Sequence, residues 1–335
     1  MPLPRPRLLA LTTLAALASA LLAAPAQAAN AAASAPANAS AAAPSASPAA
    51  APAAAPLRVL AAHPVVHGLA QQLLQGSGIE LLRMAPARLP ANRLPAYLAG
   101  RGQDELLAAA AQAHAALTLR SIWPDDQLYP LARRANIRIV EIDVATPIEG
   151  ELPGVTLPAA ALGDATPAAA GSAVLRHPPW QDSANLARMA TLMTDALARL
   201  APQAAPRLQA NLAAIQQRLQ QAEAQASRAL AQASDVSVLL LSPRMQALAS
   251  ALQLEAVPWQ APEKDDALPQ ALAQALAREK PRAVLAHAAP DDAVAQAIAA
   301  SGAQLVVLSE SAPDPVAALA GAMQAIGQAM TAAKP

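Results

Sequence analysis

The sequence predicts an α/β protein with two lobes, each containing a parallel four-stranded sheet with flanking helices, joined by a long connecting helix. Short runs rich in Val, Ile and Leu alternate with Ala/Leu-rich segments of helical length in both halves of the chain. Strands separated by helical crossovers form parallel sheets. A helical stretch without Pro or Gly, residues 183–200, separates the two series and predicts the connecting helix.

Composition limits the classes of function. A chain of 335 residues is long enough for about two domains. The 23 basic and 23 acidic residues cancel, so the chain has no excess positive charge to attract nucleic acid. There is no Cys, which excludes disulfides, thiolate metal sites, a cysteine nucleophile and a lipoprotein anchor. With no Phe, three Trp and two Tyr, the core must be mainly aliphatic.

The first 28 residues have the pattern of an export signal. A basic start, MPLPRPR, precedes an uncharged apolar run over residues 8–24. Ala26 and Ala28 supply the small residues of a cleavage site, so we expect cleavage near Ala28 and a periplasmic protein. Residues 29–56 contain only Ala, Ser, Pro and Asn, and cannot form a core. This segment is predicted to be an extended tether.

The N-terminal lobe is predicted to span residues 57–182. Pro64 sets the start of its first helix and leaves His63 just outside it. Asp125 and Asp126 are predicted to cap the following helix, because Asp is a preferred N-cap residue. The predicted strands are 57–62, 79–84, 115–120 and 137–143, and the predicted helices are 65–75, 94–113 and 126–135.

The connecting helix is assigned to residues 183–202, with Ser183 as its cap, and the C-terminal lobe to residues 203–335. That lobe begins with a helix over 207–233 and ends with one over 315–331. Its predicted strands are 236–241, 254–258, 283–287 and 303–308. In parallel sheets a ligand lies beyond the carboxyl ends of the strands, which predicts a cleft between the two lobes.

Four segments resemble the zinc/manganese-type substrate-binding proteins of bacterial ABC importers. They are LRVLAAHPVVHGLAQQLL, HPPWQDSANLARMATLMTDALARLAPQ, LLLSPRMQALASALQLEAV and KPRAVLAHAAPDDAVAQAIAASGAQLVVLSES. The resemblance covers about residues 57–331. It implies an exported, two-lobed protein that holds a divalent ion, Zn or Mn, between its lobes. It also implies delivery of that ion to an ABC permease in the inner membrane.

The family's four metal ligands are incompletely matched. The first ligand loop, residues 84–97, contains no His. The second ligand position is occupied by Pro178, with His177 beside it. The third falls in Ser242–Arg244, and Glu310 stands where the family has its final acid.

The candidate donors at predicted strand ends are His or Glu, the side chains that bind zinc through nitrogen or oxygen. They are His63, His67, His177, His287 and Glu310. An alternative site is basic, because Arg binds carboxylates and phosphates in bidentate fashion. Its candidate residues are Arg88, Arg93, Arg120 and Arg244, with Trp123 nearby.

Three hypotheses follow. The first is a monomeric metal-binding component of an importer. The second is the same fold binding an anionic small molecule or a metal chelate through an Arg-lined cleft. The third is a non-transport periplasmic interaction protein. The sequence has no G-x-S-x-G, P-loop or H-E-x-x-H motif, and no enzymatic activity is predicted.

Overall fold

The computed structural model describes residues 56–147, 153–157, 174–262, 267–309 and 312–332. The predicted signal peptide, and the predicted tether apart from its last residue, lie outside these ranges. Glu310 also lies outside them.

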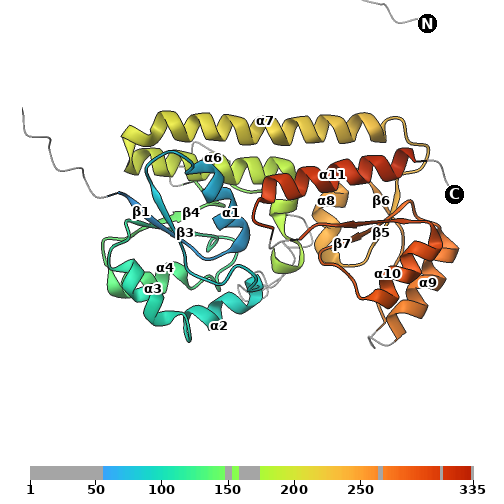
Figure 1. The fold of residues 1–335 in the computed structure, drawn as a ribbon, viewed down its shortest axis with the longest axis horizontal. Coiled ribbons are helices and arrows are strands. Elements are labelled where there is room, and N and C mark those ends of the chain that lie inside the picture. The colour runs from blue at the N-terminus through green and yellow to red at the C-terminus, as the bar shows by residue number, and fades with distance from the viewer. Residues whose placement is uncertain (1–55, 148–152, 158–173, 263–266, 310–311, 333–335) are drawn as a thin grey trace, which may run out of the picture. The chain divides into compact units, whose positions relative to one another are not determined.

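The first sheet is entirely parallel and has the strand order β2-β1-β3-β4. Figure 1 labels its strands β1, β3 and β4. Its two central strands are buried along almost their whole length, as expected for strands covered on both faces. The strands are β1 (Arg58–Ala61), β2 (Glu80–Arg83), β3 (Ala115–Thr118) and β4 (Val140–Asp143). The helices of this lobe are α1 (Pro64–Leu73), α2 (Leu94–Leu98), α3 (Gln103–Ala110) and α4 (Leu128–Ala135).

The second sheet repeats the arrangement, with the order β6-β5-β7-β8, again all parallel. Its strands are β5 (Ser237–Leu240), β6 (Glu255–Ala256), β7 (Ala283–Ala286) and β8 (Gln304–Val307). Its helices are α8 (Gln246–Ala251), α9 (Leu268–Glu279), α10 (Asp292–Ser301) and α11 (Pro315–Thr331). All eight predicted strands are present, and the predicted fold class is confirmed.

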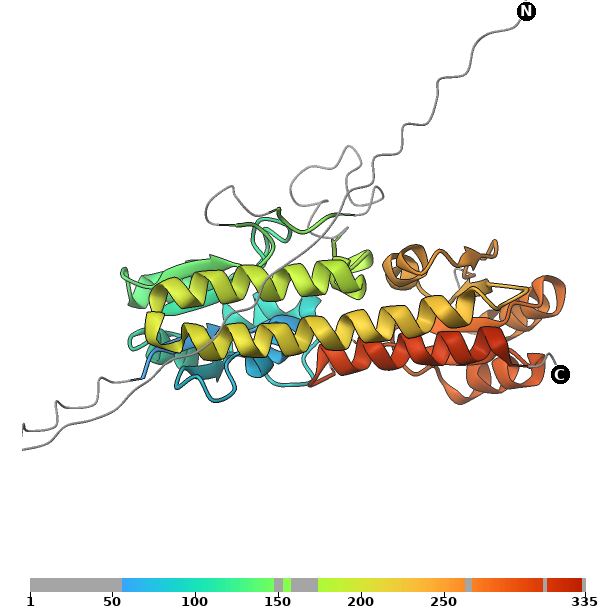
Figure 2. The ribbon, with the colours of Figure 1, turned by 90° about the horizontal axis from the view of Figure 1, so that it is seen from above.

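Two long helices lie between the sheets in sequence: α6 (Ser183–Leu200) and α7 (Ala205–Leu230). Helix α6 packs against α7 and against two elements of the first lobe, α1 and β4. Helix α7 contacts both α1 and α11, and runs beside α6 and α11 in Figure 2. Helix α7 therefore contacts helices of both lobes. The lobe boundaries predicted at residues 182 and 202 stay predictions.

The cap of α6 differs from the prediction. Asp182, not Ser183, is the N-cap, and its side chain accepts a hydrogen bond from the backbone N–H of Ala184 at 2.8 Å. Ser183 is the first helical residue, and its hydroxyl donates to Glu223 on α7 at 3.2 Å. Ser183 therefore ties α6 to α7, and the cap is formed one residue earlier.

The helix predicted over residues 94–113 is two helices, α2 and α3. The break contains Gly102, where a Cβ atom would lie 2.4 Å from the Tyr97 ring. The backbone N–H of Gly102 donates to the carbonyl of Tyr97 at 2.9 Å. The absence of a Cβ atom at Gly102 lets the chain turn closely over the aromatic ring at the point where α3 begins.

The buried residues are aliphatic, as the composition predicts, with Trp123 the largest side chain that is fully buried. Within the described ranges, no helix is both long enough and apolar enough to cross a membrane.

Candidate site at the seam between the lobes

A small cavity lies between the carboxyl edges of the two sheets. It is formed by α1, by the short 3-10 helix η3 (Pro179–Gln181), by the residues after β8 and by the start of α11. Its lining residues are Val65, Trp180, Gln181, Leu308, Ser309, Pro315, Ala318 and Leu319. We call this place the interlobe seam. It lies where the strand-end rule predicts a ligand.

His63 lies beside this cavity in an aromatic environment. It directly follows the first strand segment and is the N-cap of α1, as Pro64 at the first helical position predicts. Its ring centroid is 4.8 Å from that of Trp180 and 5.8 Å from that of Trp123, with both contacts edge-on. Trp123, a candidate residue of the alternative basic site, is buried and packs against His63.

The imidazole of His63 is neutral over the physiological range. The residue is 3% exposed, and burial lowers its pKa to about 3. Among the described residues neither ring nitrogen has a hydrogen-bond partner. A neutral imidazole presents one nitrogen lone pair, which is the form that ligates metals or accepts a hydrogen bond.

Other polar atoms near the seam are also buried. The indole nitrogen of Trp180, both amide atoms of Gln181 and Nδ1 of His177 have no hydrogen-bond partner within the part of the chain that the structure describes. Leaving such a group unpaired costs about 1–3 kcal/mol. Proteins pair nearly all their buried polar groups, so a local concentration of unpaired ones indicates a candidate binding site.

The remaining candidate histidines lie near arginines. His67, half-buried on α1, has its pKa lowered to about 4 by burial and by the charge of Arg83. Burial and the charge of Arg244 lower the pKa of His287, which follows β7. A neighbouring guanidinium repels a bare cation, which makes these two positions poorer cation ligands than His63.

Arg120 contacts both an acidic and an aromatic side chain. Its guanidinium forms an ion pair with Glu141, at 2.9 and 3.1 Å, and lies 5.9 Å from the ring centroid of Tyr129. An open depression beside it also contains Asp143. Two carboxylates against one guanidinium make this depression unfavourable for an anion. Arg88 and Arg93 are exposed on the segment between β2 and α2.

The described residues contain no group of three or more His, Asp or Glu side chains that could hold a metal ion. Among the predicted donors, His63, His67, His177 and His287 fall within the described ranges, and Glu310 does not. A complete ligand set therefore needs a donor outside those ranges or a contribution from the metal's own ligands.

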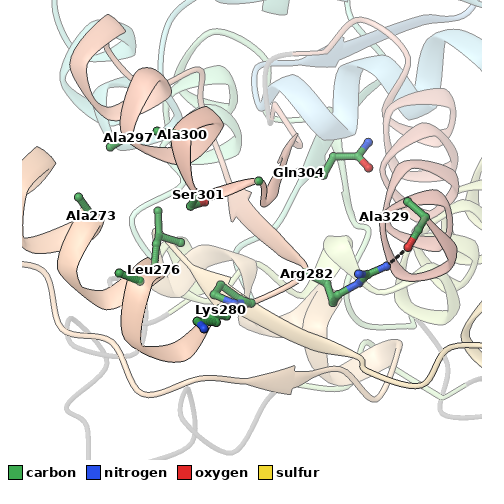
Figure 3. Close-up of a pocket in the computed structure, with 13 residues that line it drawn as sticks. Ala273, Leu276, Lys280, Arg282, Ala297, Ala300, Ser301, Gln304 and Ala329 are labelled. Carbon is green, nitrogen blue, oxygen red and sulfur yellow. Dashed lines mark hydrogen bonds between the residues drawn. The ribbon is translucent and has the colours of Figure 1, made fainter. Parts of the chain in front are cut away.

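A larger depression lies in the second lobe, away from the seam. It has a volume of about 600 Å³, six of its thirteen lining residues are Ala, and Lys280 and Arg282 are its charged residues. These two side chains extend in different directions in Figure 3. Arg282 donates to carbonyl groups at the end of α11, those of Met330 and Ala332. Its charge stabilises a helix C-terminus rather than converging with Lys280 on a ligand.

Two features of the seam were missed by sequence reasoning. Gln181 follows the Pro-Pro-Trp segment, but a neutral amide gives no periodicity or charge signal. Asp314 begins α11 and contacts α1 and α7, at 242 residues' separation from Gln72. These residues meet only because α1, α7 and α11 pack together, which no sequence pattern reports.

The comparisons with known proteins agree with the fold. The family model described as "Zinc-uptake complex component A periplasmic" matches residues 175–333, a little under half of the chain. The family resemblance seen in the sequence is thereby confirmed over this part. No curated protein matches.

Solved structures match over most of the chain. A zinc-bound deletion mutant of ZnuA is 20% identical, with a TM-score of 0.55, covering 83% of this chain and 99% of its own. The Zn(II)-bound ZnuA-like domain of Streptococcus pneumoniae AdcA is 15% identical, with a TM-score of 0.59 and coverages of 83% and 100%. FpvC from Pseudomonas aeruginosa in complex with Mn²⁺ is 16% identical, with a TM-score of 0.57 and coverages of 82% and 98%. At these identities the likeness is one of fold.

Proposed function

We propose that this chain is the periplasmic substrate-binding protein of a zinc/manganese-type ABC importer. It captures its ligand at the interlobe seam and delivers it, as a monomer, to a permease in the inner membrane. The observation that carries the proposal is a set of buried polar atoms that have no partner among the described residues. They belong to Trp180 and Gln181, which line the seam cavity, and to His63, which packs against Trp180. The matching family model and the metal-bound proteins of the same fold support it.

The ligand of this proposal is a divalent ion, Zn²⁺ or Mn²⁺. His63 supplies a neutral imidazole nitrogen from the first lobe. His177 supplies a ring nitrogen from the segment before η3. Glu310 supplies a carboxylate from the second lobe, because it follows Ser309, which lines the seam cavity. His67 and His287, which lie beside Arg83 and Arg244, are secondary candidates for metal ligands. Imidazole nitrogen suits zinc better than manganese, which prefers oxygen.

Binding in such a protein requires limited movement. The two lobes close slightly around the ligand, and the helix that contacts both lobes, α7, limits the hinge. No step of this process requires bond chemistry, in keeping with a binding protein and not an enzyme.

A metal chelate is the second candidate ligand. Two observations favour it: the described residues hold no group of three metal donors, and the indole of Trp180 lines the seam cavity. A chelate brings its own donors and presents organic surface to the indole of Trp180. The Arg-lined version of this site is weakened because Arg120 is paired with Glu141.

The test follows thermal unfolding of the chain from residue 29, freed of metal. Zn²⁺, Mn²⁺, Fe³⁺-citrate and simple anions are added separately. A ligand at 100 times its Kd stabilises by about 2.7 kcal/mol. For a protein of this size that raises the Tm by several degrees, at roughly 2–4 °C per kcal/mol.

We expect Zn²⁺ or Mn²⁺ to raise the Tm, and His63→Ala and His177→Ala to abolish the increase. His114→Ala is the matched control, because His114 is exposed at the amino end of β3. An increase with Fe³⁺-citrate and none with bare ions selects the chelate. No increase with any of these ligands contradicts both. Delivery is tested separately, as loss of metal uptake in cells lacking the gene.

A further inference from the structure

Asp314 joins three helices at the junction of the lobes. It is the N-cap of α11, where its Oδ1 accepts from the backbone N–H of Ala317 at 2.7 Å. The same oxygen accepts from Nε2 of Gln72 on α1 at 2.9 Å. Its Oδ2 accepts from Nη2 of Arg218 on α7 at 2.9 Å. One carboxylate therefore connects helix α1 of the first lobe with α11 of the second.

The three side chains form a closed ring of contacts. Nη1 of Arg218 donates to Oε1 of Gln72 at 2.8 Å, so each member touches the other two. Both polar ends of Gln72 are used, as are both oxygens of Asp314. Arg218 and Asp314 are about 40% exposed, so their ion pair alone is weak. The connected geometry orients the groups more strongly than one exposed pair would.

A second contact, one helical turn away on α1, acts at the same place. A Cβ atom on Gly68 would lie 2.7 Å from the carbonyl oxygen of Pro313 and 2.7 Å from Cδ of Pro315. Only glycine permits this approach of α1 to the start of α11. Gly68 and Gln72 are four residues apart and share one face of the helix. Residues 313–315 are thus held to α1 by close packing and by hydrogen bonds.

The position of this contact relates it to the seam. Leu308 and Ser309, which follow β8, line the seam cavity, and so does Pro315. Asp314 lies between these two groups in sequence. Anchoring it to α1 and α7 therefore fixes the second-lobe wall of the cavity relative to the first lobe.

We propose that Asp314, with Gln72 and Arg218, is an interlobe lock that positions the second-lobe wall of the ligand site. Its importance for binding rests on the proposed function, but the lock itself does not. Asp314 is a positioning residue, because nothing in its contacts requires it to touch the ligand. Without the lock, the wall carrying Ser309 moves relative to His63, and binding weakens.

The test measures the distance between the lobes directly. The chain has no Cys, so Glu105→Cys on α3 and Gln274→Cys on α9 introduce two unique, exposed labelling sites. Pulsed spin-label spectroscopy then gives the distribution of distances between them. The variant is Asp314→Asn, which keeps an N-cap but removes the charge that binds Arg218. The control is Asp291→Asn, at the N-cap of α10, which accepts only from Val294 in the described contacts.

We expect a narrow distribution in the parent and in Asp291→Asn, and a broader one in Asp314→Asn and in Gln72→Ala/Arg218→Ala. Zn²⁺ titration should show the Kd increased about threefold to fivefold in the broadened variants, the effect of losing one partly exposed charged pair. An unchanged distribution overturns the lock. A broadened distribution with an unchanged Kd overturns its positioning role. If the parent binds no Zn²⁺, the proposed function fails for that ion, while the distances still decide whether the lock exists.

Discussion

The imidazole of His63 lies edge-on to the indole of Trp180, with 4.8 Å between the ring centroids and 66° between the planes. His63 belongs to the first lobe, and Trp180 lines the cavity that reaches Ser309 of the second. This pair therefore places a neutral imidazole next to the interlobe seam. Its burial makes the protein's stability depend on pH in a defined direction.

His63 should make the protein less stable in acid. Its pKa is about 3 in the folded chain against 6.5 ordinarily, so between these values the unfolded state binds a proton that the folded state does not. The free energy of unfolding then falls as the pH drops below 6.5, by at most about 1.4 kcal/mol per pH unit. Urea unfolding of His63→Leu from pH 7 to pH 4 should show a shallower decline. An equally steep decline would contradict this.

Asp126 should act in the opposite direction. Burial raises its pKa to about 6, so between about 3.8 and 6 the folded state binds more protons than the unfolded state. Its contribution to stability therefore rises as the pH falls from about 6 towards 3.8. Asp126→Asn removes this rise. The amide also has one oxygen for the two backbone donors, Leu119 and Leu128, so we expect a loss of about 1 kcal/mol from one hydrogen bond.

Trp123→Ala should be among the most destabilising single changes. The residue is 2% exposed, and its ring packs against the imidazole of His63. Truncating a buried Trp costs about 3–5 kcal/mol. Trp259→Ala, at a partly buried position, is the matched comparison and should cost less. Equal losses in chemical unfolding would show that Trp123 is not a central support.

Arg120→Met tests the Arg-lined alternative. Because Arg120 is paired with Glu141 and partly exposed, its loss should cost at most about 1 kcal/mol. The response of the Tm to anions and to Fe³⁺-citrate should be unchanged. If anions raise the Tm of the parent but not that of this variant, the anionic site in the first lobe is supported.

Lys280→Gly should stabilise the protein. Lys280 follows α9 in the left-handed region, with φ of 47°, a conformation that favours glycine. We expect an increase of about 0.5–1 kcal/mol from relief of this strain. Gly302→Ala, at the equivalent position after α10 with φ of 76°, should destabilise. Tm measurements on both variants check the two signs together.

The strands were predictable because each is a short apolar run bounded by Gly, Pro or polar residues. The last helix begins at Pro315, where Pro and the preceding Asp314 mark a start, and it was predicted with its observed bounds. The division of 94–113 into two helices falls where Tyr97 packs over Gly102, a contact that no periodicity reports.

The site was less predictable than the fold. His63 and Trp123 could be proposed individually from their places after strands, but not as neighbours of each other. Their contact depends on how the loop after β3 folds back, held by Asp126. Arg120 was predicted to face a ligand. It pairs with Glu141 because β3 and β4 are neighbours in the sheet, and the sequence does not reveal which strands are neighbours.

The contact between Gln72 and Asp314 also bears on the order of folding. Each sheet is assembled from a continuous stretch of chain, whereas this contact closes a separation of 242 residues. Long loops cost more entropy to close, so short-range pairing precedes long-range pairing. Each sheet can therefore form before the lobes are joined, and the last helix completes the molecule only when its first residues reach α1. A chain truncated before α11 would retain its first sheet and lack the closing step.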